Sequence, residues 1–144
     1  MKDLEKYPVI QKFPVQWGDM DAAQHVNNLV YLRWAESARI YYFMKMNMDT
    51  SFSGDAAGPI LGWQDCKYIF PITFPDTAVV GTRVIEILED RFTLESAVFS
   101  EKHQRIASLS KHTIIAYDYK ALKKAALPAA WLKGIKELEN PTAV

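Results

Sequence analysis

One short polar segment holds residues whose types and spacing could do chemistry. Residues 19–28 read DMDAAQHVNN and contain two carboxylates, an imidazole and three carboxamides. A carboxylate can attack an acyl carbonyl as a nucleophile or activate water as a general base. A helix that begins in the same segment would add backbone N–H groups that have no intrahelical partner and favour negative charge. The segment can therefore supply both the attacking group and the stabilisation of the carbonyl oxygen.

The same residues also have ordinary structural uses. Asp in loops commonly forms Asx turns or caps helices, which is the usual role of an isolated D-x-D. Because His-Val-Asn-Asn and a helix follow, we expect Asp21 to be the catalytic carboxylate and Asp19 to be structural. His25 could orient substrate or water, or could be a loop histidine bonded to backbone, and both interpretations stay open.

A long helix must position this segment. Residues 29–47 read LVYLRWAESARIYYFMKMN, about 19 residues or about 28 Å of helix. Asn27 or Asn28 is a plausible N-cap. The helix has only a narrow polar stripe, so we expect it to be central and covered on most sides. That stripe consists of Arg33, Glu36, Ser37 and Arg39.

The other regular segments read mainly as strands. One strand is expected over residues 7–17, where Pro14 is awkward for a sheet interior. After a loop over residues 50–59, four more are expected over residues 61–74, 78–89, 92–102 and 106–119. Short turns, including one at Pro75-Asp76, and alternation favour consecutive antiparallel hairpins. Pro71 and Gly81 are expected to mark bulges or bends, and residues 128–138 a short closing helix.

Composition limits the class of protein. The chain has 144 residues, 49% of them hydrophobic, which suits a single domain over residues 1–144 with its own core. Seventeen basic and seventeen acidic residues balance, which argues against generic binding to nucleic acid or to an anionic membrane. The single Cys66, the absence of a signal-peptide pattern and the absence of a bilayer-spanning apolar run predict a cytoplasmic protein.

The order strand, D-x-D, His-Val-Asn-Asn and aromatic helix resembles the hotdog-fold thioesterases of the 4-hydroxybenzoyl-CoA thioesterase type. YIFPITFPDT, residues 68–77, is similar to the stretch of that family's second strand. The resemblance covers nearly the whole chain and implies an α+β fold, with an antiparallel five-stranded sheet wrapped around a long central helix. The residues that carry it in the N-terminal motif are Asp19, Asp21, His25, Val26, Asn27, Asn28, Tyr31, Leu32, Glu36 and Arg39.

The resemblance also implies a function. The expected activity is hydrolysis of an acyl-CoA by a homodimer or homotetramer, with sites at subunit interfaces and no cofactor. Asp21 would be the catalytic carboxylate, and a backbone N–H at or near Asn28 would polarise the thioester carbonyl. Asn27, Tyr31 and Arg91 are the expected substrate-binding residues. Gln24 stands where many members carry Gly, and because Gln disfavours positive φ, the connection is expected to be shaped differently.

Several other residues have two interpretations. Glu36 could be a second acid or base, but an ion pair with Arg33 or Arg39 is favoured. The helix aromatics are more often core than pocket, and Cys66 in a strand pattern is more often inert than nucleophilic. Arg91 is the first candidate for the phosphates of coenzyme A, ahead of four other cations, but an ordinary solvated charge is the favoured interpretation for each of the five. Those four are Lys102, Arg105, Lys123 and Lys124.

The sequence offers no recognisable metal site, no G-x-S-x-G elbow and no glycine-rich phosphate loop. Two functions compete with hydrolysis. One is a non-catalytic hotdog domain that binds acyl-CoA, although a sensing regulator would need a DNA-binding segment for which this length leaves no room. The other is a hotdog dehydratase acting on acyl thioesters, which Asp21 before His25 fits less well.

Overall fold

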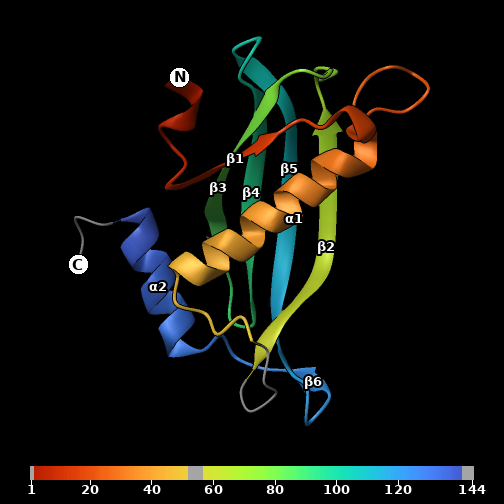
Figure 1. Ribbon diagram of the computed structural model, residues 1–144. Coiled ribbons are helices and arrows are strands. Elements are labelled where there is room, and N and C mark those ends of the chain that lie inside the picture. The colour runs from red at the N-terminus through yellow and green to blue at the C-terminus, as the bar shows by residue number, and fades with distance from the viewer. Residues whose placement is uncertain (1, 52–56, 141–144) are drawn as a thin grey trace.

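The computed structural model describes residues 2–51 and 57–140. A curled antiparallel sheet carries a long helix, α1, across one face, and a shorter helix, α2, lies beside the C-terminal end of α1 (Figure 1). This α+β arrangement confirms the predicted fold. The elements are β1 (Val9–Pro14), α1 (Asn28–Lys45), β2 (Gly58–Tyr68), β3 (Thr77–Ile87), β4 (Arg91–Ser100), β5 (Arg105–Asp118), β6 (Lys123–Lys124) and α2 (Ala129–Glu139), with 3-10 turns at Lys2–Leu4 and Trp17–Asp19.

The five predicted strands form one sheet in the order β1-β3-β4-β5-β2, and the two-residue β6 adds to β5. The hairpins β3–β4 and β4–β5 are confirmed, whereas a hairpin between β2 and β3 is wrong. β2 ends at Tyr68 and pairs with β5, while β3 pairs with β1 and β4. Pro71 and Pro75 lack the N–H that strand pairing needs, and Ile72 between them is fully buried. This segment leaves the sheet after β2 and leads the chain to β3, which lies next to the edge strand β1.

Of the two expected bulges or bends, the one at Pro71 coincides with a bend at Phe70, and the one at Gly81 is wrong. Pro71 lies beyond β2, and Gly81 is regularly paired with Ile10 and Ala97. Two of the register shifts fall instead between Leu61 and Trp63 in β2 and between Val84 and Glu86 in β3. Gly81 is needed for another reason, because a Cβ there would lie 2.6 Å from the Tyr7 ring.

Helix α1 begins at Asn28, one residue before the prediction, and ends at Lys45. Asn27 is its N-cap, and its side chain accepts a 2.9 Å hydrogen bond from the Leu29 N–H. The polar stripe predicted for α1 includes Arg39. Arg39 is only 7% exposed, so its placement on the polar face is wrong. The buried side of α1 consists of Val30, Tyr31, Trp34, Ala35, Ala38, Arg39, Tyr42 and Phe43.

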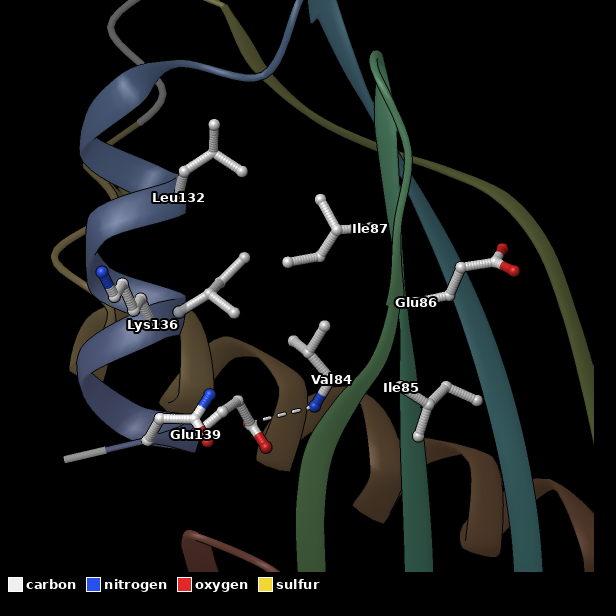
Figure 2. Close-up of a pocket in the computed structure, with 9 residues that line it drawn as sticks. Val84, Ile85, Glu86, Ile87, Leu132, Lys136 and Glu139 are labelled. Atoms are coloured by element: carbon white, nitrogen blue, oxygen red, sulfur yellow. Dashed lines mark hydrogen bonds between the residues drawn. The ribbon is translucent and has the colours of Figure 1, made fainter. Parts of the chain in front are cut away.

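Helix α2 is fastened to the end of α1 and to β3. Its Gly134 packs so closely that an added Cβ would lie 1.9 Å from the Met46 carbonyl oxygen. The Glu139 carboxylate accepts hydrogen bonds from the Tyr42 hydroxyl and from the Val84 N–H (Figure 2). Burial and this carboxylate raise the pKa of Tyr42 well above its usual range. The C-terminal half of the chain thus fixes the far end of α1.

The loop predicted over residues 50–59 falls largely on residues 52–56, which lie outside the described residues, and β2 already begins at Gly58. Within the described ranges, no helix is both long and apolar enough to cross a bilayer.

Candidate active site

The polar segment forms a tight loop just before α1. Met20 and Val26 make an isolated antiparallel bridge, the Asp21 N–H donates to the His25 carbonyl at 3.3 Å, and the Gln24 N–H donates to the Asp21 carbonyl at 2.9 Å. Gln24 adopts a φ of 64°, so the different backbone shape expected from the absence of Gly is wrong at this position. The surrounding hydrogen bonds hold the left-handed conformation despite its cost for a side chain.

Asp19 anchors the loop. Its carboxylate is 7% exposed and accepts from the Gln16 N–H and from the Arg33 guanidinium, both at 2.9 Å. Its carbonyl accepts from the Asn27 N–H at 2.9 Å, immediately before the helix. Asp19 therefore ties the strand exit to the start of α1.

Asp21 has a different environment. Its side chain is exposed, and one carboxylate oxygen accepts from the Ala23 N–H at 2.9 Å in an Asx turn. The other oxygen has no hydrogen-bond partner in the described part of the chain. The Asx turn considered for Asp21 is thus present. Within the described residues it leaves one carboxylate oxygen available for chemistry.

The first turn of α1 presents an unpaired donor. The Leu29 N–H is bound by the Asn27 side chain, and the Val30 N–H is bound by the Asn27 carbonyl. For the Asn28 N–H, no acceptor is found among residues 2–51 and 57–140. A free N–H at a helix N-terminus is suited to an oxygen that gains negative charge.

Asp21, His25, Asn28 and Tyr31 line one cleft of about 320 Å³. The structure thus brings four of the six predicted site residues together. Asn27 is not among the lining residues, because its side chain caps the helix. The other lining residues are Val26, Tyr68, Ile69, Phe70 and Pro71.

Two tyrosines shape the wall of this cleft. The Tyr31 hydroxyl donates to the Phe70 carbonyl at 3.2 Å and accepts from the Ile72 N–H at 2.9 Å. The Tyr68 hydroxyl donates to the Asn28 carbonyl at 3.0 Å. Burial raises the pKa of both, to about 12 for Tyr68, so both are neutral at pH 7. Each hydroxyl is engaged in holding the wall in place.

The contribution of residues 68–71 to the cleft was not predicted. Their aromatic and proline-rich run resembles the family's second strand, and the sequence pattern predicts one continuous strand over residues 61–74. The prolines are the sequence feature that indicates this contribution, because a residue without an N–H disfavours continued strand pairing. β2 ends at Tyr68, and the chain then crosses the start of α1. The Val26 N–H donates to the Ile72 carbonyl at 2.8 Å and joins the two segments.

Arg91 is not brought to this cleft within one chain. It lies at the β3–β4 turn, at the opposite end of the sheet from the start of α1 (Figure 1). Its guanidinium binds the Asp90 carboxylate at 2.7 and 3.1 Å, and this carboxylate raises the pKa of Arg91. A substrate-binding role for Arg91 stays a prediction that requires a second subunit.

A buried polar cluster lies farther along α1. The Arg39 guanidinium lies 3.2 Å from His112 Nδ1, and Ser110 Oγ lies 2.9 Å from His112 Nε2. His112 is fully buried, and burial together with the Arg39 charge lowers its pKa to about 4. Glu36 lies 3.7 Å from Arg39, which fits the ion pair favoured for it. The neutral imidazole is a hydrogen-bond acceptor for Arg39.

Two further features offer no comparable chemistry. A groove between α2 and β3 has Ile87 and Leu132 facing its interior, while Ile85 and Glu86 point away from α2 (Figure 2). The nearby Glu139 carboxylate is already occupied by Tyr42 and Val84. Cys66 on β2 is partly buried, and burial raises the pKa of its thiol, which disfavours a thiolate nucleophile. The described residues contain no group of His, Cys, Asp and Glu that could hold a metal ion.

Comparisons with known proteins agree with this fold. The family model of the thioesterase-like superfamily matches residues 15–135, and the chain belongs to that superfamily. Its sheet and central helix are the hotdog fold. No match was found among curated proteins.

Several solved structures are similar over almost their full length. A thioesterase from Thermus thermophilus, complexed with coenzyme A and Zn, is 27% identical with a TM-score of 0.83, covering 94% of this chain and 96% of that one. A putative thioesterase from Pseudomonas aeruginosa is 25% identical with a TM-score of 0.80, covering 90% and 98%. A 1,4-dihydroxy-2-naphthoyl-CoA thioesterase from Synechocystis is 17% identical with a TM-score of 0.83, covering 92% and 98%, and shows the fold alone.

Proposed function

We propose that the chain is an acyl-CoA thioesterase that hydrolyses an acyl-CoA to a free acid and coenzyme A. The observation that carries the proposal is that Asp21 and Asn28 line the same cleft, while one Asp21 carboxylate oxygen and the Asn28 N–H have no hydrogen-bond partner among the described residues. A carboxylate and a helix N-terminal donor are the two groups that attack on a thioester carbonyl requires. Coenzyme A as the carrier is supported by the bound coenzyme A of the Thermus thermophilus relative.

In the general-base route, Asp21 takes a proton from water while the water oxygen attacks the carbonyl carbon. The carbonyl oxygen becomes an oxyanion that accepts a hydrogen bond from the Asn28 N–H. The C–S bond then breaks, the acid is released, and the sulfur leaves with the proton. His25 lines the same cleft and would orient the water or the thioester.

In the nucleophilic route, Asp21 attacks the carbonyl carbon itself, and the C–S bond breaks as the coenzyme A thiolate leaves. Water then cleaves the mixed anhydride that has formed, which releases the acid and regenerates the Asp21 carboxylate. Rapid quenching of a single turnover separates the two routes. An acyl group covalently attached to Asp21, or ¹⁸O from labelled water in the Asp21 carboxylate, supports the nucleophilic route, and the absence of both supports general-base attack.

We also propose that the chain works as a homodimer in the cytoplasm, joined along the free edge of β2. Edge strands expose unpaired backbone groups and are usually short or charged in monomers. Here β2 is long and carries exposed apolar side chains, including Trp63 at 57% and Tyr68 at 45% exposure. Tyr68 also lines the cleft, so a partner on this edge would lie next to the site. Pairing of two dimers would give the alternative homotetramer.

The test of the proposed function is release of free thiol from a panel of acyl-CoAs that varies in chain length and aromatic character. Release with at least one member of the panel supports hydrolysis. Binding of acyl-CoA without thiol release would instead support a non-catalytic binding domain. Consumption of an enoyl thioester without thiol release would support a dehydratase.

A further inference from the structure

One arginine near the cleft has no ionic partner in the described part of the chain. Four of the chain's five arginines lie within 4.0 Å of a carboxylate, namely Arg33, Arg39, Arg83 and Arg91. Arg105, the first residue of β5, has no carboxylate at that distance within the described ranges, and its side chain is exposed. A guanidinium without a counter-charge is able to bind an external anion.

The side chain of Arg105 is held in place by an aromatic ring. Its guanidinium carbon lies 4.5 Å from the centroid of the Phe70 ring, and the His103 ring lies 4.9 Å from the same centroid. Phe70 lines the cleft that contains Asp21 and Asn28. Arg105 is therefore one side chain away from the proposed site and is positioned by a cation–π contact.

The β4–β5 turn that carries these residues is itself fixed. The Asp76 carboxylate accepts hydrogen bonds from the Ser100 hydroxyl at 2.5 Å and from the Lys102 N–H at 2.9 Å. Glu101, which lies in this turn, is 3.1 Å from Lys12. The Asp76 and Glu101 carboxylates are thus engaged with other groups, and Arg105 has no ion pair among the described residues.

We propose that Arg105, stacked on Phe70, binds a phosphate of the thioester carrier and so holds the substrate at the mouth of the cleft. This inference rests on the proposed function and adds a substrate-positioning residue to it. Arg binds phosphate through two parallel N–H···O hydrogen bonds, whereas the acyl part of a thioester carries no phosphate. The anion recognised must therefore belong to the carrier arm, and Arg105 rather than Arg91 supplies the contact within one chain.

The experiment measures kcat and KM for one acyl group carried by coenzyme A, by phosphopantetheine and by pantetheine, which lacks phosphate. In Arg105→Gln, we expect KM for the acyl-CoA to rise about tenfold with kcat unchanged, and KM for the acyl-pantetheine to stay the same. A rise that extends to the phosphopantetheine thioester assigns the contact to the arm phosphate, and a rise for acyl-CoA alone assigns it to the nucleotide phosphates. Lys133→Gln, which removes an exposed cation on α2, is the matched control.

Equal loss with the phosphate-free substrate, or no change with acyl-CoA, would overturn the proposal. Calorimetric titration of the free carriers separates this failure from failure of the proposed function. Coenzyme A should bind the native protein more tightly than pantetheine does, and Arg105→Gln should remove most of that difference even if no thioester is hydrolysed. Native protein that binds both carriers equally would contradict the role of Arg105.

Discussion

At the residue scale, Asp19 and Asp21 lie two positions apart and have opposite surroundings. Asp19 is buried with two donors on its carboxylate, while Asp21 is exposed with one oxygen free. These surroundings determine which of the two carboxylates is available to a substrate. A buried carboxylate held by an N–H and a guanidinium stabilises the fold, whereas an exposed carboxylate in a cleft is available to substrate.

The first prediction concerns stability at these two positions. Asp19→Ala leaves the Gln16 N–H and Arg33 without their acceptor and should lower the free energy of unfolding by about 1–3 kcal/mol. Asp21→Ala should change it by less than about 0.5 kcal/mol, because the site is exposed. Urea denaturation of both variants checks the contrast. Equal losses at the two positions would contradict the separate roles.

The second prediction concerns pH and His112. Its folded pKa of about 4 lies below its ordinary value of 6.5, so the unfolded state binds a proton first as pH falls. The stability that depends on the neutral imidazole is complete above pH 6.5 and is lost as pH falls toward 4. The loss should be on the order of 3 kcal/mol in total.

Denaturation curves collected between pH 7 and pH 4 test this dependence. His112→Gln cannot titrate and should lose less stability over that range than the native chain does. His103→Gln is the matched control, because His103 is exposed and its variant should keep the native dependence. A His112→Gln variant as sensitive to pH as the native chain would contradict the assignment.

At the element scale, α2 packs against the end of α1 that lies opposite the cleft. Gly134 allows this contact, since any Cβ would collide with the Met46 backbone. Gly134→Ala should therefore destabilise the fold by about 1–3 kcal/mol, although Ala is the better helix former. Thermal unfolding beside Lys133→Ala, an exposed neighbour, checks this. A Gly134→Ala variant as stable as the Lys133 control would show that α2 does not pack as described.

The elements also show how far sequence reasoning reaches. The bounds of α1 and of β3 to β5 were predicted within two residues, because helical composition, alternation and short turns are local properties. The pairing partner of β2 was not predicted, since it depends on contacts between distant strands. The sequence places Arg39 on the polar face for a similar reason. Its buried hydrogen-bond partner, His112, is distant in the sequence and is identified only by the fold.

The site divides in the same way. The sequence pattern was sufficient to expect Asp21, His25, Asn28 and Tyr31 together, since all four lie within one loop and one helix turn. Residues 68–71 are distant from the loop in the sequence. They line the same cleft only because the segment that follows β2 crosses the start of α1. The preference for Arg91 over Arg105 was based on turn position alone. Arg91 forms an ion pair with Asp90, whereas Arg105 lies over the Phe70 ring, and this difference is visible only in the folded chain.

At the scale of the whole molecule, the exposed edge of β2 carries the prediction of a homodimer. Trp63→Lys places a charge on that edge and should convert a dimer to a monomer in size-exclusion chromatography with light scattering. Trp17→Lys is the matched control, because Trp17 is 73% exposed but lies outside the sheet. A native chain that is monomeric at micromolar concentration would contradict the proposed assembly.

The central claim is that Asp21 performs the chemistry in a cleft completed by the start of α1. The most direct measurement is the rate of thiol release from the best acyl-CoA of the panel by the native chain and by Asp21→Asn. The variant keeps the side-chain oxygen that accepts from Ala23 but loses the charge that activates water or attacks the carbonyl. We expect kcat to fall at least about a hundredfold with the fold unchanged by circular dichroism. A folded Asp21→Asn variant that releases thiol at the native rate would contradict the claim.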